Sequence, residues 1–362
     1  MTRQTTALIC LALAASMALA RTIGAGAESK PQPYSYYSPA TGTVNLENLA
    51  FEPGRIEARG RPFESDVVVL TGLSRTLARL TPAGKVRWML DVAGGGGAYG
   101  LSSTDGLLAV SFGPDVLLVE PASGKVVERL PLLTPGSDRV ISSLRVQDDL
   151  LIATESRPGG DIVIAKIVRE HGRRARLNVV DRISTRMEAP RDALLLSPDQ
   201  LLVADTFGHA VVLFERRSRW RETRRWAEYF PNMLDWRNGA LTVLSEHANR
   251  IGRWSLQTNQ RQVVVSCPHP LFADVRTKPQ QLVAEEPRTR SGESPPRQIC
   301  STDIAGDQTL YAANGFFDEG NGHLWVADAD NHRVALFVDG QFWGALTGIN
   351  HPVRVIPVSR LH

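Results

Sequence analysis

Two stretches of this chain carry the same pattern, LWVADADNHRVALF at residues 324–337 and LLVADTFGHAVVLF at residues 201–214. In each, an apolar run leads through Ala-Asp into a short polar segment that ends in a histidine, His332 or His209, and a second apolar run follows. Two apolar runs joined by a short polar segment are typical of two β-strands and the turn between them. A strand pair that recurs within one chain indicates a fold made of repeated units.

The apolar strand that follows a polar turn recurs about every forty residues. Its central residues are Val68, Leu108, Ile152, Val203, Val243, Val283 and Val326, which are separated by 40, 44, 51, 40, 40 and 43 residues. About forty residues is the length of a four-stranded β-propeller blade. Helical periodicity is nearly absent, so we predict an all-β chain that folds as a β-propeller with seven blades. The alternative is six blades, if the irregular stretch 268–306 is an insertion.

The end of the chain predicts how the ring closes. The run HPVRVIP at residues 351–357 resembles the first strand of a unit, but no unit follows it, and the unit around Val68 lacks a first strand of its own. We therefore expect the last strand to pair into the first unit. This pairing would leave no open sheet edge between the two ends of the propeller.

The N-terminus has the features of a secretory signal peptide. Arg3 precedes an apolar stretch at residues 7–20, and small residues mark alternative cleavage sites after Ala20 and Ala27. We predict a signal peptide over residues 1–27, a polar leader over 28–65 and the propeller domain over 66–362, in a periplasmic or secreted protein. No later segment approaches the roughly 20 apolar residues that a membrane-spanning helix needs, so we expect no integral membrane segment after signal removal.

Two cysteines, Cys267 and Cys300, remain outside the predicted signal peptide. An even number of cysteines in an exported chain predicts a disulfide bond between them.

The formal charge of +3 is too small to indicate a polyanionic partner. Residues 216–226 combine several arginines with Trp220 and Trp226. In an exported protein this pattern favours a solvated outer strand with a basic face over a nucleic-acid surface. We expect no nucleic-acid partner.

The residues of the repeat resemble those of a known superfamily. VAD at 326–328 with NHRV at 331–334 resembles the NHL-repeat signature, and VAD at 203–205 with His209 is a degenerate copy. SEHANRI at 245–251 is similar to the corresponding turn of gluconolactonase-like and streptogramin-lyase-like propellers. The resemblance implies a β-propeller of this broad superfamily, whose members include binding platforms, sugar lactonases and lyases. It does not select among them.

Several polar residues of the repeat have a structural interpretation. Short polar side chains in tight turns accept hydrogen bonds from backbone N–H groups, which is the role we expect for Asp205, Asp328 and Asn331. His209 and His332 stand at equivalent places in their repeats. Their repetition predicts that both pack one blade against the next.

The same loops also contain the candidate binding residues. In a propeller, the loops from the second to the third strand emerge with the blade junctions on one face around the central channel, and ligands usually bind there. The repeat places these candidates in those loops: Asp205, His209, Glu246, His247, Asp328 and His332. Carboxylates and imidazoles that converge on one channel could hold a divalent cation, with oxygen ligands favouring Ca²⁺ or Mg²⁺.

The resemblance implies two further sets of residues. A gluconolactonase-like enzyme is expected to bind its metal through a glutamate, an asparagine and an aspartate, for which Glu246, Asn249 and Asp328 are the candidates. A streptogramin-lyase-like mechanism needs a general base, for which His269 or His351 would serve as the catalytic residue.

The sequence contains no G-x-S-x-G, Walker, HExxH or zinc-spaced cysteine motif, so serine hydrolase, nucleotide-binding and zinc-protease functions lack support. No complete catalytic pattern is present, and a binding module is therefore favoured over an enzyme. The leading hypothesis is an exported propeller that binds a protein partner or a small-molecule ligand through its loop-bearing face. The alternative is a metal-dependent lactonase or lyase that acts at the mouth of the central channel.

Overall fold

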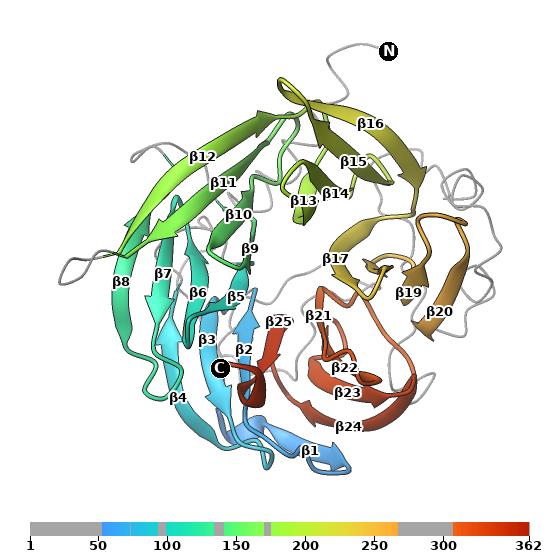
Figure 1. Cartoon of the computed structure of the whole chain (residues 1–362). Coiled ribbons are helices and arrows are strands. Elements are labelled where there is room, and N and C mark those ends of the chain that lie inside the picture. Colours follow the sequence, from blue (N-terminus) through green and yellow to red (C-terminus); the bar gives the residue numbers. More distant parts are fainter. Residues whose placement is uncertain are drawn as a thin grey trace, which may run out of the picture. The chain divides into compact units, whose positions relative to one another are not determined.

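In the computed structural model, six antiparallel sheets radiate from a common axis as the blades of a β-propeller (Figure 1). The structure describes residues 53–72, 74–92, 99–133, 141–169, 175–266 and 307–361. The chain divides into Met1–Ala50 and Phe51–His362, and all described residues belong to the second unit. Within the described ranges, no helix has the length and apolar character needed to cross a bilayer.

Each blade contains four strands in order from the channel outward, with a fifth strand on blade 6. Blade 1 consists of β25 (Pro352–Pro357), β2 (Val67–Thr71), β3 (Thr76–Leu80) and β4 (Val86–Asp91). Blade 2 consists of β5 (Leu101–Thr104), β6 (Leu107–Phe112), β7 (Asp115–Val119) and β8 (Val126–Pro131). Blade 3 consists of β9 (Ser143–Gln147), β10 (Leu150–Thr154), β11 (Asp161–Val168) and β12 (Arg176–Ser184).

The second half of the ring repeats this order. Blade 4 consists of β13 (Pro190–Ser197), β14 (Gln200–Asp205), β15 (Ala210–Arg216) and β16 (Trp220–Ala227). Blade 5 consists of β17 (Pro231–Arg237), β18 (Ala240–Ser245), β19 (Arg250–Trp254) and β20 (Arg261–Ser266). Blade 6 consists of β21 (Gly315–Asp318), β22 (His323–Asp328), β23 (Arg333–Val338), β24 (Gln341–Thr347) and the added β1 (Glu57–Gly60). Two short 3-10 helices, η2 (Pro53–Arg55) and η4 (Val358–Arg360), flank the strands.

The ring has six blades, so the six-bladed alternative is confirmed and the prediction of seven is corrected. The innermost strand β17 of blade 5 lies directly against β21 of blade 6, where the amide of Phe316 donates to Sδ of Met233 at 3.3 Å. This contact leaves no room for a blade between them. The seventh expected strand, around Val283, lies outside the described residues.

The other six expected strands are the second strands of the blades, β2, β6, β10, β14, β18 and β22. They are almost entirely buried because each blade packs between two others. Some of their hairpins turn through residue pairs with positive φ, such as Asp105-Gly106 and Asn238-Gly239. Asp-Gly and Asn-Gly pairs favour such turns, which match the twist of the two strands they join.

The predicted ring closure is confirmed. β25 pairs antiparallel with β2, with Val355 opposite Val69, so the last strand of the chain is the first strand of blade 1. Both residues belong to one apolar cluster that also contains Trp325 of blade 6. The last strand therefore joins blade 1 by hydrogen bonds and packs it against blade 6.

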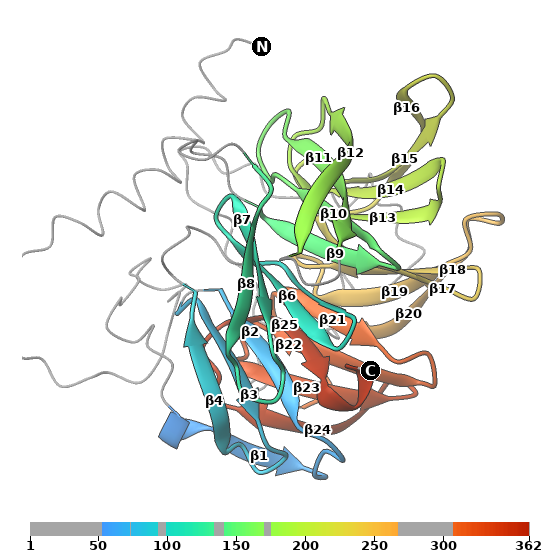
Figure 2. The same ribbon diagram turned by 60° about the vertical axis from the view of Figure 1, so that its left-hand side comes forward.

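Part of the segment predicted as a leader forms β1, which adds to the outer edge of blade 6 (Figures 1 and 2). Its four residues pair with β24, with Ala58 opposite Leu346, and all four are exposed. The arginine-rich segment forms β16, the exposed outermost strand of blade 4, as the sequence predicts. The predicted signal peptide and the predicted disulfide between Cys267 and Cys300 lie outside the described residues.

Candidate functional site: the central channel

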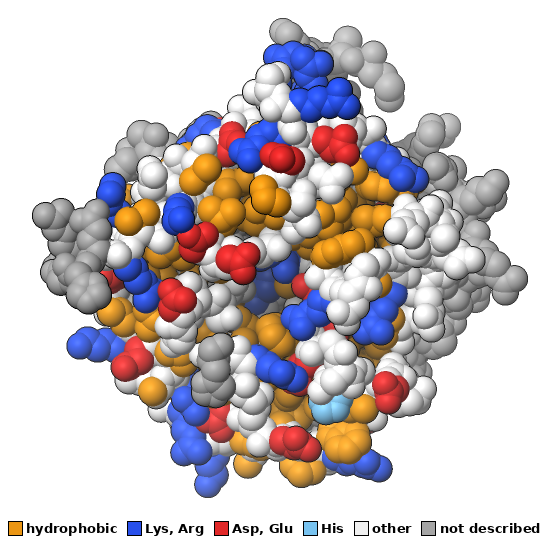
Figure 3. Space-filling model, in the orientation of Figure 1, with side chains coloured by type: hydrophobic (Ala, Val, Ile, Leu, Met, Phe, Trp, Pro, Cys, Tyr) orange, Lys and Arg blue, Asp and Glu red, His pale blue; other side chains and the backbone are white. Residues whose placement is uncertain are grey.

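The innermost strands of all six blades enclose a cavity of about 690 Å³ at one end of the central channel. It opens on the face that carries the turns between the first and second strands of the blades, which we call the hairpin face. Figure 3 shows this face, hollowed at its centre, with Lys or Arg side chains at the base of the hollow. The opposite face, which carries the turns between second and third strands and the blade junctions, is called the loop face.

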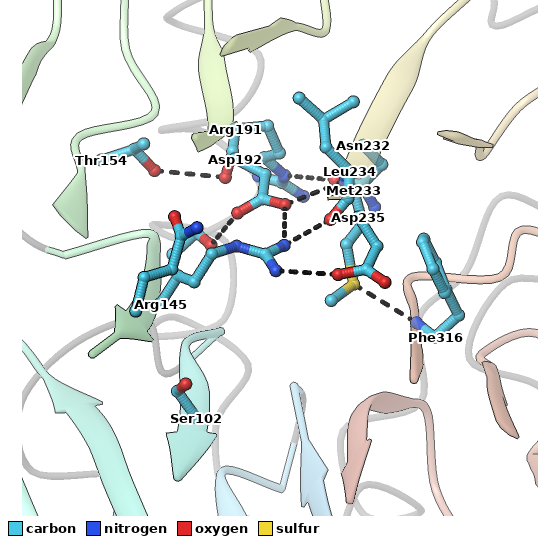
Figure 4. Close-up of polar contacts among 12 residues, drawn as sticks. Ser102, Arg145, Thr154, Arg191, Asp192, Asn232, Met233, Leu234, Asp235 and Phe316 are labelled. Carbon is cyan, nitrogen blue, oxygen red and sulfur yellow. Dashed lines mark hydrogen bonds and ion pairs between the residues drawn. The ribbon is translucent and has the colours of Figure 1, made fainter. Parts of the chain in front are cut away.

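Arg145 of β9 ties three blades together beside this cavity (Figure 4). Its Nη2 donates to Oδ2 of Asp192 at 2.8 Å and to the carbonyl of Leu234, and its Nη1 donates to Oδ1 of Asp235 at 3.4 Å. Asp192 also accepts from Oγ of Ser143 at 3.2 Å and from the amide of Leu234 at 2.9 Å. Burial opposes the charge of Arg145, but attraction by Asp192 and Asp235 outweighs it and raises the pKa of the guanidinium. These contacts fix β9, β13 and β17 relative to one another.

A second group of polar contacts links blade 4 to blade 1. Nε of Arg191 donates to Oδ1 of Asn232 at 3.1 Å, and Nδ2 of Asn232 donates to both oxygens of Asn314 at 3.1 Å (Figure 4 shows the first of these contacts). Nη1 of Arg354 then donates to the carbonyls of Asn314 at 2.6 Å and Val353 at 2.8 Å. Polar side chains therefore connect β13, β17, β21 and β25.

Arg354 differs from Arg145 because it has no carboxylate partner among the described residues. Its side chain lines the cavity although the residue is only 5% exposed. Burial lowers the pKa of its guanidinium to about 10; Arg191 and Arg145 add to this effect, and Asp192 and Glu246 oppose it. Arg354 thus stays charged at neutral pH in a poorly solvated place.

Asp328, a predicted binding residue, has a structural role at the loop face. Its Oδ1 accepts from the amide of Tyr311 at 2.8 Å, and its Oδ2 accepts from Nδ2 of Asn331 at 2.8 Å and Nε of Arg333 at 2.7 Å. The residue is fully buried. Burial raises the pKa of its carboxyl in spite of these donors.

Asp205 holds the corresponding place in blade 4. Its Oδ1 accepts from the amide of Ala189 at 3.0 Å, and its Oδ2 lies 3.2 Å from Nη1 of Arg225. In both blades, an aspartate at the end of the second strand therefore accepts from the backbone that leads into the same blade. This is the structural role that the sequence predicts for Asp205 and Asp328.

The expected packing role of His209 and His332 is observed, and Asn249 shares it. In each case a residue with positive φ at the end of a loop accepts a hydrogen bond from a residue with positive φ at the entrance of the next blade. The pairs are Phe230 N to His209 Nδ1 at 3.2 Å, Ala312 N to Asn249 Oδ1 at 2.7 Å and His351 N to His332 Nδ1 at 3.3 Å. We call these three contacts the junction bonds.

The remaining predicted site residues also lie at the loop face. The ring of His247 stacks on Phe230 with centroids 3.6 Å apart, and the buried Glu246 donates its amide to the carbonyl of Phe230 at 3.1 Å. Nδ1 of His351 is 3.4 Å from Oδ1 of Asp330. His269 lies outside the described residues.

The three expected metal ligands do not fit a cation site in this arrangement. Oδ1 of Asn249 already accepts a junction bond, and both carboxylate oxygens of Asp328 accept from buried donors, so neither is placed for a metal together with Glu246. In the part of the chain that the structure describes, no three His, Cys, Asp or Glu side chains are grouped to hold a metal ion.

Sequence reasoning missed the charged residues of the channel. Arg145, Asp192, Asp235 and Arg354 are charged residues within the first strands of their blades. A charge inside such a strand was the available signal, because the first strand of a blade lines the channel.

The junction bond of His332 predicts a loss of stability in acid. Burial, with repulsion by His351, lowers the pKa of His332 from 6.5 to about 4 although Asp330 opposes the shift. The unfolded chain takes up this proton near pH 6.5, so the contribution of neutral His332 is complete above that pH and is lost as the pH falls to about 4. A shift of this size corresponds to about 3 kcal/mol. Urea unfolding at several pH values measures it.

His332→Asn is the matched variant for this prediction, since Asn249 makes the same junction bond in blade 5. The variant is expected to keep most of its stability at pH 7 and to lose about 3 kcal/mol less than the native protein between pH 7 and pH 4. Equal losses in the two proteins would show that His332 does not cause the effect.

Comparisons with known proteins place the chain by its fold. No protein-family model and no curated protein matches it. A protein of unknown function from Bacteroides caccae has a TM-score of 0.58 at 13% identity, covering 82% of this chain and 99% of that chain. A putative 6-phosphogluconolactonase from Bacteroides uniformis ATCC 8492 has a TM-score of 0.51 at 10% identity, and the match covers 81% of this chain and 98% of that chain. A chain of a nidogen–laminin complex has a TM-score of 0.51 at 11% identity, and the match covers 80% of this chain and 97% of that chain.

At these identities the similarity shows the fold alone. The chain is a β-propeller, which is the fold that the resemblance of its repeats implies.

Proposed function

We propose that this propeller is a binding module whose site is the cavity on the hairpin face. The observation that carries the proposal is a cavity of about 690 Å³ that is lined by all six innermost strands. Sites for small molecules are typically clefts of about 300 to 1,000 Å³ with a few placed polar groups. The proposal moves the site to the end of the channel opposite the loop-bearing face that the sequence favours.

The ion pairs around the cavity support a site that is formed before the ligand arrives. Arg145 links β9, β13 and β17 through Asp192 and Asp235, and all three residues line the cavity. A site held by such contacts loses little conformational entropy on binding, which favours affinity for a small ligand. We also propose that the protein is exported, as its N-terminal sequence indicates.

Blocking the cavity tests the proposal. Ser103 lines the cavity at the end of β5, and Ser103→Trp would fill part of it. A screen of sugars, amino acids and organic acids by thermal shift should identify compounds that stabilise the native protein but not Ser103→Trp. The matched control Arg221→Trp, on the exposed outer strand β16, should respond like the native protein. Ligands that stabilise all three proteins equally would place the site elsewhere.

The metal-dependent lactonase or lyase remains the alternative from the sequence, but the donors described at the loop face do not support it. Asp328 is paired with Arg333, and Asn249 is held in a junction bond. Turnover of a lactone that depends on Ca²⁺ or Mg²⁺ and is abolished in Glu246→Gln would favour this alternative over the binding module.

A further inference from the structure

Every charged residue that lines the cavity makes an ion pair except Arg354. Four carboxylates line the cavity, and each is paired with an arginine other than Arg354. The pairs are Asp192 with Arg145 at 2.8 Å, Asp235 with Arg237 at 2.8 Å, Asp318 with Arg253 at 2.9 Å and Glu319 with Arg360 at 2.9 Å. Arg354 makes no ion pair among the described residues, although Asp192 and Glu246 attract its charge from beyond ion-pair distance.

The hydrogen bonds of Arg354 leave one edge of its guanidinium unused. Nη1 donates to the carbonyls of Asn314 and Val353, and these are the only hydrogen bonds that the side chain makes within the described residues. Nε and Nη2 therefore donate to no protein group there. These two nitrogens form the edge of an arginine that binds the two oxygens of a carboxylate side by side.

We propose that the cavity binds a small organic monocarboxylate, whose two oxygens accept hydrogen bonds from Nε and Nη2 of Arg354. This inference rests on the proposed function and names the class of its ligand. It assigns Arg354 as the residue that recognises the charged group, while the remaining cavity receives the body of the ligand.

The charge balance favours a carboxylate over a phosphate. One negative charge neutralises the single unpaired cation, whereas a dianion would bring a second negative charge close to Asp192 and Asp235, which also line the cavity. A buried cation is costly without a partner, and the lowered pKa of Arg354 reflects this cost. Binding of an anion removes this cost. The ligand therefore gains affinity by neutralising the charge of Arg354, which has no ion-pair partner in the free protein.

Isothermal titration with matched acids and amides tests the proposal. The probes are benzoate, hexanoate and N-acetylphenylalanine, each compared with its primary amide, together with inorganic phosphate. We expect at least one acid to bind, and its amide to bind about 30-fold more weakly or not at all. Arg354→Met should weaken binding of that acid by a similar factor. Arg354→Lys, which keeps the charge but loses the paired donors, should fall between the two.

The stability of the free variants separates recognition from a structural role. If Arg354 serves to neutralise a ligand, replacing it with methionine removes an unpaired buried charge, and the melting temperature without ligand should stay the same or rise. A structural role through Asn314 and Val353 predicts a lower melting temperature instead. The control Arg221→Met, at an exposed position of β16, should change neither binding nor stability.

Three results would overturn the proposal: amides that bind as tightly as the acids, phosphate that binds in preference to the acids, or an Arg354→Met variant that retains the affinity of the native protein. If neutral compounds stabilise the native protein but not Ser103→Trp, the binding site exists but its ligand is not a carboxylate. If no compound stabilises the native protein more than it stabilises Ser103→Trp, the proposed function itself is contradicted.

Discussion

Deleting residues 352–362 is expected to leave a chain with no cooperative unfolding transition. The deletion removes β25, whose six residues are all buried. Val353 and Ile356 belong to the apolar cluster between blades 1 and 2, and Val355 belongs to the cluster between blades 1 and 6. Two blade interfaces are therefore lost together, and the inner edge of β2 is exposed to aggregation. Calorimetry and size-exclusion chromatography measure both effects.

A substitution in β1 provides the comparison for this deletion. β1 is also joined to a blade from a distant part of the chain, but its residues are exposed and lie at the outer edge of blade 6. Ala58→Pro should therefore lower the melting temperature by only a few degrees, which corresponds to about 1 kcal/mol. A deletion variant that unfolds cooperatively near the native melting temperature would contradict the role assigned to β25.

The second large effect is expected for Arg333→Met in blade 6. Arg333 is 1% exposed, and its Nε lies 2.7 Å from Oδ2 of the fully buried Asp328. Removing the cation leaves a buried carboxylate without its ionic partner, which typically costs about 3 to 5 kcal/mol. Urea unfolding at pH 7 should show this loss. The variant should also lose the bonds from Nη2 of Arg333 to the carbonyls of Asp307 and Thr309.

Two further variants isolate the cause. In Arg333→Met with Asp328→Asn the buried charge is absent, so part of the stability should return. Arg225→Met breaks the corresponding contact with Asp205, but Arg225 is 39% exposed, and the expected loss is about 1 kcal/mol or less. Similar losses for Arg225→Met and Arg333→Met would show that burial does not set the cost of breaking these pairs.

The fold could be predicted from the sequence because the same pattern, an apolar strand after a polar turn, recurs about every forty residues. Six of the seven expected strands are the second strands of blades, and the last strand closes the ring. The predicted count of seven blades is wrong because it rests on one strand-like run, around Val283, for the seventh blade. A single apolar run carries no information about the three strands that must pair beside it.

The candidate site was harder to predict because the chemistry of a residue does not reveal its conformation. His209, Asn249 and His332 resemble site residues, but each has positive φ and accepts the amide hydrogen of the next blade. Arg145 and Arg354 lie in strands, and they face a cavity only because the ring brings six first strands together. That arrangement depends on the closed ring and cannot be read from any one repeat.

The pairing of β25 with β2 also sets the order of events during biosynthesis. When a ribosome has made blade 1 as far as β4, the sheet still lacks its first strand, which is translated only after the other five blades. Pairings between such distant segments form slowly. Blade 1 of the nascent polypeptide therefore lacks its first strand through almost the whole of translation. The sheet is completed only after Pro352–Pro357 has been synthesised.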